Sequence, residues 1–488
     1  MAGGTPTGLR LALTVRLLLL LPHGGSAAQK PARPPLVGRR PFVAAWNAPL
    51  DMCAIKYNVS MELDGLFHIR GSPRADWTGQ NVTIFYANRL GYYPRYTAQG
   101  EALHGGVPQN GSLDVHLLKA YRDIQHFIPA RDFRGLAVID WEFWRPQWSR
   151  NWHKKDVYRR QSRELTAKAY LNVTAAQVEE LAQRRFEKSA QEFMQRTLQL
   201  GTRMRPDGLW GFYLYPDCHN YNLHEDGYTG LCPAPERLRN DELRWLWNSS
   251  TALFPSVAIR KAHGGSAGSL RFARHRVREA LRVASLTSRD HELPVYVYLR
   301  LGYRDEPLTF LTTHNCSKVR WFLNHRLGQY ITNVTRAAES CSHFLCQNNG
   351  RCVRRNPGAR HYLHLDADSY SIRPGSDGSF VVGGRHSPRA LQTLAEHFRC
   401  HCYEGHLGER CRSANEVPED DAGRDLGDDE RRRSEWEDEQ ADQGRSGASP
   451  AAGLAAGLLT LLMLLLNFRG TLETLECLLA CWLLACYS

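Results

Sequence analysis

The sequence predicts an α/β fold in which parallel strands form a barrel and a small disulfide-bonded module follows. Short apolar runs, each about as long as a buried strand, recur between stretches that are long enough for crossover helices. Beyond residue 337 the composition changes, and six cysteines follow within about seventy residues. An open doubly wound sheet is the alternative, but no Gly-rich phosphate loop follows the first expected strand.

The expected strands comprise residues 41–46, 82–86, 135–140, 209–215, 253–259 and 293–301. Of the stretches between them, residues 175–200 show the clearest helical spacing of apolar side chains. Because crossover helices join parallel strands, this alternation favours the barrel.

The chain begins with the features of a cleavable signal peptide, expected over residues 1–28. Arg10 and Arg16 accompany an apolar run at residues 17–21, and small residues follow at 26–28. Seven Asn-x-Ser/Thr glycosylation sequons also favour the secretory pathway. They begin at Asn58, Asn81, Asn110, Asn172, Asn248, Asn315 and Asn333.

The formal net charge of +12 understates the basicity of the body of the chain. Residues 416–445 alone carry thirteen acidic and five basic side chains, so the remainder is strongly cationic. For an exported protein, such a surface attracts sulfated or carboxylated glycans rather than nucleic acid. Simple solubility explains the size of the charge equally well. Ten cysteines before residue 412 indicate disulfides, so neither a metal nor a cofactor is expected.

Residues 337–412 have the cysteine spacing of an epidermal-growth-factor-like module with one long insertion. A module this small cannot bury much apolar surface, so cross-links would supply its stability. The pairing usual for this spacing joins Cys341 to Cys352, Cys346 to Cys400 and Cys402 to Cys411.

An acidic linker at residues 413–450 leads to an apolar tail at residues 451–488. Two kinds of membrane anchor fit this tail. Its first apolar run has the length of a short spanning helix, whereas the small residues before it resemble a lipid-anchor signal. The polar spacer of such a signal is nearly absent, which favours a spanning or hairpin segment at the cell surface or another membrane.

The expected strand at residues 135–140 ends abruptly in two carboxylates, Asp140 and Glu142. On a strand, residues i and i+2 face the same side, and at about 3.3 Å per residue their backbones lie roughly 6 to 7 Å apart. Both side chains can therefore enter one cavity at the carboxyl end of a barrel strand. With Trp141 and Trp144 as walls, one carboxyl is expected to have a raised pKa and to act as an acid. A strand end capped by solvated acids is the alternative.

A second strand end favours the first interpretation. Tyr213 and Asp217 follow the apolar run at 209–215 and place a phenol and a carboxylate at a comparable height. Aromatic walls with a few acids suit sugars, whose C–H faces stack while their hydroxyls bond to carboxylates. Trp210 and Tyr215 are expected to be packing residues.

Six motifs of the chain together carry a resemblance to a known family. They are Pro41-Phe-Val-Ala-Ala-Trp46-Asn, Asn81-Val-Thr-Ile-Phe-Tyr86, His104-Gly-Gly-Val-Pro-Gln109-Asn, Val138-Ile-Asp140-Trp-Glu142, Trp210-Gly-Phe-Tyr213 and Ala252-Leu-Phe-Pro-Ser256. These motifs resemble those of the animal hyaluronidases, glycoside hydrolase family 56, over roughly residues 40–411. The resemblance implies a distorted (β/α) TIM-type catalytic barrel at residues 40–335, and within the family it is strongest to the chondroitin-preferring type.

The resemblance also implies a retaining, substrate-assisted hydrolysis of glycosaminoglycans. Glu142 would protonate the glycosidic oxygen and later activate water, while the acetamido oxygen of the sugar attacks the anomeric carbon. Asp140 would orient and stabilise that acetamido group, which Tyr213 and Asp217 would hold. Arg276 would be a cation near the substrate, and a helical salt bridge is its alternative role. By the same resemblance Cys53 pairs with Cys316 and Cys218 with Cys232.

Two departures from the family pattern bear on function. Ala258 stands where hyaluronan-cutting members have a tyrosine, so chondroitin and hyaluronan both remain candidate substrates. Between Leu311 and Thr312 the family holds about thirty residues that are absent here, so the barrel is expected to lack its last strand. The second hypothesis is therefore a catalytically impaired, membrane-held protein that binds anionic glycosaminoglycan.

Overall fold

The computed structural model describes residues 29–74, 77–300, 302–305, 313–375 and 378–413. The predicted signal peptide, the anchor tail and all but the first residue of the predicted acidic linker lie outside these ranges. Within them, no helix combines the length and the apolar character needed to cross a bilayer.

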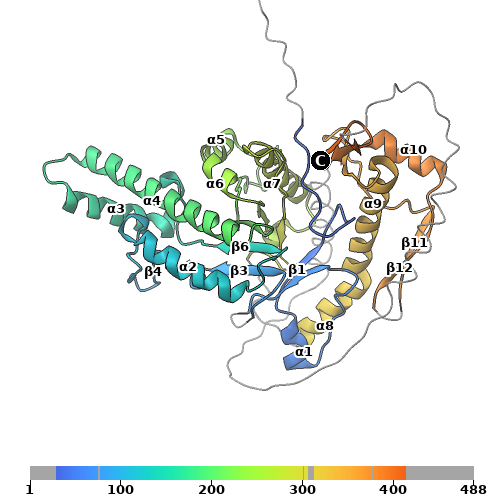
Figure 1. Cartoon of the computed structure of the whole chain (residues 1–488), viewed down its shortest axis with the longest axis horizontal. Helices are drawn as coiled ribbons and strands as arrows, with labels where there is room; N and C mark the ends of the chain where they lie inside the picture. Colours follow the sequence, from blue (N-terminus) through green and yellow to red (C-terminus); the bar gives the residue numbers. More distant parts are fainter. Residues whose placement is uncertain (1–28, 75–76, 301, 306–312, 376–377, 414–488) are drawn as a thin grey trace, which may run out of the picture.

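Three groups of parallel strands form the centre of the described molecule, and they follow one another in chain order (Figure 1). Backbone pairing is parallel between β1 and β2, between β3, β6 and β7, and between β8 and β9. The predicted parallel α/β architecture is thus confirmed. The strands are β1 (Ala45–Asn47), β2 (Ile69–Gly71), β3 (Val82–Tyr86), β6 (Leu136–Asp140), β7 (Leu209–Phe212), β8 (Ser256–Val257) and β9 (Tyr298–Leu299).

Single parallel bridges, from Tyr213 to Phe254 and from Leu253 to Val295, continue the sheet from β7 toward β9. Within the described residues no backbone pairing joins β9 to β1. A side-chain hydrogen bond links these two edges, in which the Asn47 amide donates to the Tyr298 hydroxyl at 3.3 Å. Among the described residues no backbone pairing joins β2 to β3 either, although these two strands are in contact.

The predicted strand at 41–46 is shorter than expected and shifted to β1, and the one at 209–215 ends at Phe212. In the second case Leu214 has φ 75°, a left-handed conformation that no regular strand can contain. Strand β2 was not predicted, because its three residues include an exposed Arg70 and no apolar run.

The helices pack outside the sheet, and the antiparallel pair α3–α4 projects at one end of the molecule (Figure 1). The predicted helix at 175–200 is confirmed as α4, which begins at a capping box between Thr174 and Gln177. The helices before the last third of the chain are α1 (Asp51–Tyr57), α2 (Leu113–Phe127), α3 (Asp156–Ala169), α4 (Ala175–Met204), α5 (Ala234–Glu242), α6 (Arg244–Ser249) and α7 (Ala267–Ser285).

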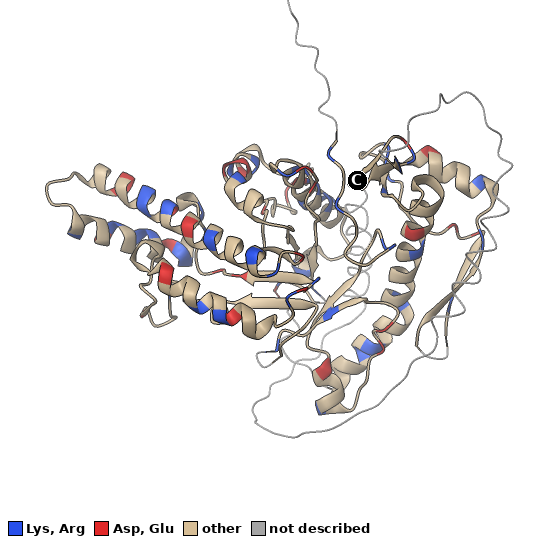
Figure 2. Cartoon of the chain, viewed as in Figure 1, with Lys and Arg blue, Asp and Glu red and all other residues tan. Residues whose placement is uncertain are grey.

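Strand β6 is apolar on both faces because each face is covered. Ala137 and Ile139 belong to the core that α2 and α4 form with the outer side of the sheet. Leu136 and Val138 alternate with them and belong to the core inside the curve. Basic and acidic residues are interspersed along the helices (Figure 2).

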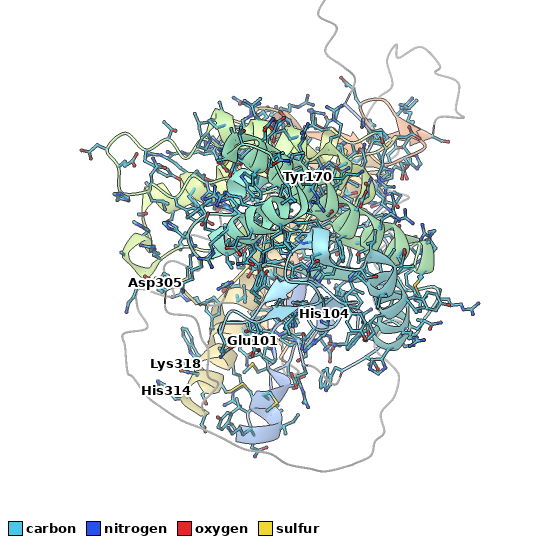
Figure 3. The ribbon with its side chains drawn as sticks, turned by 90° about the vertical axis from the view of Figure 1, so that its left-hand side faces the viewer. Glu101, His104, Tyr170, Asp305, His314 and Lys318 are labelled. Carbon is cyan, nitrogen blue, oxygen red and sulfur yellow. A yellow bond between two sulfur atoms is a disulfide. The ribbon has the colours of Figure 1, made fainter. Side chains whose placement is uncertain are left out.

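The last third of the described chain contains a long helix and short antiparallel pairs. Helix α8 lies beside α1, and His314 and Lys318 mark it in Figure 3. Helix α9 runs without interruption across residue 336, so the barrel region and the cysteine-rich region share it. The elements are α8 (Thr313–Phe322), a π-helical turn (Leu323–Leu327), α9 (Gly328–Cys346), α10 (Pro388–His397), and the strand pairs β10 (Gly350–Arg354) with β13 (Phe398–Cys402), β11 (Tyr370–Pro374) with β12 (Phe380–Gly384) and β14 (His406–Leu407) with β15 (Arg412–Ser413). A further antiparallel pair, β4 (Arg95–Tyr96) with β5 (Ala102–Leu103), lies in the loop after β3.

Five disulfides link the described residues, and they join the pairs that the sequence led us to expect. They are Cys53–Cys316, Cys218–Cys232, Cys341–Cys352, Cys346–Cys400 and Cys402–Cys411.

Gly71 marks a close approach between β2 and β3. A Cβ there would lie 2.8 Å from the Cβ of Val82 and closer still to its carbonyl oxygen. We expect Gly71→Ala to lower the free energy of unfolding by about 2 to 3 kcal/mol, because the neighbouring backbone must shift. Gly38→Ala is the control, since a Cβ at Gly38 meets nothing within 4 Å. Urea unfolding of both variants measures the difference, and equal stabilities would contradict this account of β2.

Candidate active site

The register of the central strands brings the predicted residues together. Asp140 is paired with Tyr86 of β3 across the sheet. On the other side, the backbone N–H of Tyr213 donates to the carbonyl of Ile139 at 2.9 Å. Because the strands are parallel, these residues all lie at the carboxyl ends, where a barrel presents its site.

Two adjoining cavities open at these strand ends, with volumes of about 690 and 600 Å³. Glu142, Tyr213 and Arg300 line both of them. Asp140 lines the smaller cavity and Asp217 the larger one. Four of the five predicted site residues thus face one continuous region, with Glu142 and Tyr213 at its centre.

Asp140 is the carboxyl with the raised pKa. Burial and the neighbouring charge of Glu142 raise its pKa to about 7, although Arg145 and Arg300 act in the opposite direction. Its Oδ1 is buried and has no hydrogen-bond partner among the described residues. Asp140 can therefore hold a proton near neutral pH and has an oxygen available for a ligand.

Glu142 is more open to solvent, with 48% of its side chain exposed. Its Oε1 lies 3.9 Å from the Arg145 guanidinium, which also lies over the ring of Tyr215 at 5.9 Å. Lys155 donates to the backbone carbonyl of Glu142. Burial, followed by the charge of Arg145, lowers the pKa of Lys155 to about 8.

The two tryptophans do not wall the acid pair, and that prediction was wrong. Trp141 stacks on Tyr93 at a centroid distance of 4.5 Å, and Trp144 donates through its indole N–H to the Pro94 carbonyl. Both are buried in the core under α4. An alternating strand sends every second side chain to the other face, so a residue between two cleft acids points into the core.

The pKa of Asp217 is shifted in the opposite direction to that of Asp140. Burial alone would raise its pKa, but Arg276, His219 and further arginines hold the pKa at about 2. Arg276 donates to the Asp217 carboxylate and, at 2.9 Å, to the Cys218 carbonyl. Its exposed fraction is 2%, and it lines neither cavity. Arg276 therefore lies behind Asp217, in the salt-bridge role that was the alternative, and fixes that carboxylate as an anion.

Tyr213 joins the two cavities through polar contacts. Its hydroxyl lies 3.1 Å from the Ser256 hydroxyl, and Arg300 donates to it at 3.4 Å. Its ring meets the edge of Tyr298 at 5.1 Å. A second tyrosine, Tyr86 at the end of β3, lies beside Asp140. Burial and the charge of Asp140 raise the pKa of Tyr86, so the Tyr86 hydroxyl stays protonated.

Sequence reasoning missed the cations that surround these acids. Arg300 directly follows β9, where a strand-end rule like the one that found Asp140 would also have found it. Arg145 and Lys155 lie in the segment after β6 and are brought in by tertiary packing, for which the sequence gives no periodic pattern. The cleft is thus bordered by arginine and lysine, as an anionic ligand requires.

Four of the seven predicted sequon asparagines are exposed: Asn58, Asn81, Asn110 and Asn172. Asn248, Asn315 and Asn333 are half-buried, and the side chain of Asn333 accepts from the Leu365 N–H at 2.8 Å. Among the described residues, no group of three or more His, Cys, Asp or Glu side chains could hold a metal ion.

A pair of carboxylates at the carboxyl ends of a parallel, barrel-like set of strands is the arrangement that glycoside hydrolases use. Comparison with known proteins identifies the family. The sequence profile described as hyaluronidase matches residues 31–315 and 309–415. The chain belongs to the hyaluronidase family and is a glycoside hydrolase.

Curated relatives and solved structures agree with this assignment. Hyaluronidase-4 of Homo sapiens is 52% identical over 430 residues, which cover 82% of this chain and 89% of the relative. Hyaluronidase-1 of Bitis arietans is 41% identical, with 78% and 92% covered. The crystal structure of bee venom hyaluronidase matches with a TM-score of 0.52 at 30% identity, covering 59% of this chain and 99% of that one. A complex of bee venom hyaluronidase with a hyaluronic acid tetramer matches with a TM-score of 0.51, also at 30% identity, covering 59% and 97%.

Loss of the cation behind Asp217 should destabilise the fold. We expect Arg276→Met to lower the free energy of unfolding by about 3 kcal/mol at pH 7, because it removes the buried guanidinium that is bonded to the partly buried Asp217 carboxylate. The depressed pKa of Asp217 stabilises the fold above the unfolded value near 3.8 and stops doing so as pH falls toward 2. The deficit should therefore be smaller at pH 3 than at pH 7 in urea unfolding.

The control for this variant is Arg278→Met, at an exposed arginine on the same helix. A loss of stability that is equal for the two variants, or independent of pH, would rule out the ion pair as its cause.

Proposed function

We propose that the chain hydrolyses β-N-acetylhexosaminide bonds of glycosaminoglycans with retention of configuration, using Glu142 as the acid and base. The observation that carries the proposal is the Asp140–Glu142 pair at the end of β6. One of these carboxyls has a pKa of about 7, and the other is open to the cleft. A pair of acids that keeps a proton near neutral pH is what protonation of a leaving oxygen requires.

In the first step Glu142 donates its proton to the glycosidic oxygen, and the bond from that oxygen to the anomeric carbon breaks. The acetamido oxygen of the same sugar forms a bond to the anomeric carbon from the opposite face. In the second step Glu142, now a carboxylate, removes a proton from water, which replaces the acetamido oxygen. No protein nucleophile is needed, unlike in the scheme with two catalytic carboxylates.

Asp140 stabilises the acetamido group while its nitrogen gains positive charge. The buried Oδ1 without a partner is available to accept the acetamido N–H. Tyr213 lies beside both cavities and can donate its hydroxyl to the acetamido oxygen, and Asp217 binds hydroxyls in the larger cavity. Arg276 positions Asp217 and does not contact substrate.

Burial and the charge of Glu142 raise the pKa of Asp140 to about 7, so Asp140 holds a proton below that pH. This proton can pass to the neighbouring Glu142 when substrate binds. Hydrolysis is therefore fastest below about pH 7 and falls as Asp140 loses its proton.

The substrate is an anionic glycosaminoglycan, with chondroitin preferred over hyaluronan. Ala258 lines the larger cavity and has no hydroxyl to offer at that point. Arg150, Lys154 and Arg304 line the same cavity and favour a polymer with carboxylate or sulfate groups. For one solved relative, bound hyaluronic acid is documented.

We also propose that the barrel lacks one strand and helix of the family pattern. The family profile matches two stretches of the chain, residues 31–315 and 309–415, which overlap at residues 309–315. The alignment with human Hyaluronidase-4 extends over 430 positions but includes only 82% of this chain, which is about 400 residues. Roughly thirty aligned positions of the relative therefore have no counterpart in this chain, and thirty residues is about the length of one strand and helix of a barrel. An apolar cavity of about 160 Å³ between β1 and β9 supports the same conclusion.

This open edge favours a second candidate function, a catalytically impaired protein that binds anionic glycosaminoglycan in the same cleft. An unpaired edge inside a barrel exposes backbone groups and lowers stability. The cationic lining of the cleft is independent of the missing unit and still attracts the polymer.

For the chain as a whole we propose a catalytic barrel at residues 40–335 and an epidermal-growth-factor-like module at 337–412, both luminal or extracellular. Five disulfides support an oxidising compartment. The signal peptide and the seven glycosylation sites belong to the same proposal.

Glu142→Gln should reduce the release of new reducing ends from chondroitin and hyaluronan by about 10² to 10⁴-fold, since it removes the proton donor. Its thermal unfolding should match that of the wild type, because the Glu142 side chain is half exposed. Glu409→Gln, at an exposed glutamate far along the chain, is the control. A wild-type chain that cleaves neither polymer but binds both in a salt-sensitive way would contradict hydrolysis and support the second candidate.

Asp140→Asn should abolish hydrolysis yet stabilise the fold at pH 8 by about 1 to 3 kcal/mol. The folded chain binds the Asp140 proton more tightly than the unfolded chain, so wild-type stability falls as pH rises from about 4 to 7. The amide removes that dependence, and the two proteins should be equally stable near pH 4. Urea unfolding at pH 4.5 and 8 measures this, with Asp226→Asn at an exposed position as control. An Asp140→Asn protein that gains no stability at pH 8 would contradict the raised pKa.

A further inference from the structure

A third cavity, of about 280 Å³, lies at the amino ends of the strands, opposite the carboxylates. Residues that precede the strands line it, among them Val43 before β1, Arg134 before β6 and Tyr296 before β9. Arg351 and Tyr403 from the cysteine-rich region complete the wall. The cavity thus lies where the barrel and that region meet.

Four arginines line this cavity, and three of them are paired with carboxylates. The pairs are Arg40 with Glu339 at 2.8 Å, Arg134 with Asp207 at 3.7 Å and Arg351 with Glu292 at 3.4 Å. The fourth, Arg33, has no carboxylate partner within the described residues. Its positive charge at the cavity wall is therefore uncompensated there.

A second cation, Arg289, lies near Arg33 but does not line the cavity. Arg289 lies close enough to Arg33 that burial and the charge of Arg33 lower its pKa. The Nε of Arg289 is buried and has no hydrogen-bond partner in the described part of the chain. Two neighbouring guanidinium groups without an anion repel each other, and a bound anion would remove that cost.

Tyr403 supplies an unused hydrogen-bond donor at the same wall. Its exposed fraction is 7%, and its hydroxyl is buried without a partner among the described residues. Burial raises the pKa of Tyr403 to about 12, so the hydroxyl stays protonated. A buried hydroxyl without a partner is costly, and it is expected where a ligand completes its hydrogen bond.

The backbone next to Arg33 is held in place on two sides. The N–H of Ala32 donates to the Cys402 carbonyl at 2.8 Å, and the N–H of Glu404 donates to the Ala32 carbonyl at 3.0 Å. On the barrel side, the N–H of Glu292 donates to the Pro31 carbonyl at 2.9 Å. Arg33 is thus presented from a fixed backbone, which lowers the entropy cost of binding an anion.

We propose that this cavity is a second site for anionic glycan, one that holds a single sulfated or carboxylated sugar unit against Arg33 and Tyr403. A volume of 280 Å³ lies at the small end of ligand pockets and suits one sugar ring with its anionic group. The site does not depend on hydrolysis, because none of its residues lines the active-site cavities. A ligand there contacts both the barrel and the cysteine-rich region.

Calorimetric titration of the full chain carrying Glu142→Gln tests the site, with a sulfated chondroitin disaccharide, glucuronate and inorganic sulfate as separate probes. We expect two classes of site for the disaccharide. Adding Arg33→Gln should weaken one class about tenfold, the effect of one charge-assisted hydrogen bond. Adding Tyr403→Phe should weaken the same class several-fold without changing the thermal midpoint, since no protein hydrogen bond is lost. Arg196→Gln, at an exposed arginine of α4, should change neither class.

Binding of glucuronate or sulfate alone that depends on Arg33 would also support the site and would tell which anionic group it selects. One class of site for the disaccharide, unaffected by both Arg33→Gln and Tyr403→Phe, would overturn the proposal. Because all proteins in the titration carry Glu142→Gln, this result is separate from the presence or absence of hydrolysis.

Discussion

The parallel register of β3, β6 and β7 is the constraint on which the rest of the site depends. It pairs Tyr86 with Asp140 and places Tyr213 beside Ile139, so that three separate segments deliver their polar groups at one height. A shift of one residue in β6 would turn Asp140 and Glu142 toward the core and the tryptophan between them toward the cleft. Such a shift would bury two carboxylates in the apolar core and remove Trp141 from its stack on Tyr93, and both effects oppose it.

Two carboxylates in this cleft have opposite protonation, and their neighbours explain why. Asp217 is bonded to a buried guanidinium and stays ionised, whereas Asp140 lies half-buried beside another acid, and no cation of the described residues is bonded to it. The same side chain thus serves as a fixed charge in one place and as a proton reservoir in the other. The difference in pKa between these two aspartates comes from Arg276, which is bonded to Asp217 and lies behind it, away from the cavities.

Much of this arrangement could be predicted from the sequence because it is local. Apolar runs of strand length located most of the sheet, and carboxylates at strand ends located Asp140, Glu142 and Asp217. What escaped prediction was non-local. The inward direction of Trp141 could have been predicted, because it follows from strand alternation once the acids are assigned to the cleft. Strand β2 could not, because it has no apolar run. Arg145 and Lys155 could not either, because they reach the site through tertiary packing. The course of α9 across the expected domain boundary could not be foreseen, because cysteine spacing marks disulfides and not helix ends.

The amino ends of the strands are usually the stabilising end of such a barrel, and the contacts here fit that role. The segment at residues 29–32 is hydrogen-bonded to both the barrel and the cysteine-rich region, and ion pairs from Arg40 and Arg351 fasten the same junction. A continuous helix, α9, joins the two parts on the other side. Arg40 and Arg351 each have a carboxylate partner, as residues that stabilise a junction should. Among the described residues Arg33 has no carboxylate partner and the Tyr403 hydroxyl has no hydrogen-bond partner, and the proposed second site depends on this difference.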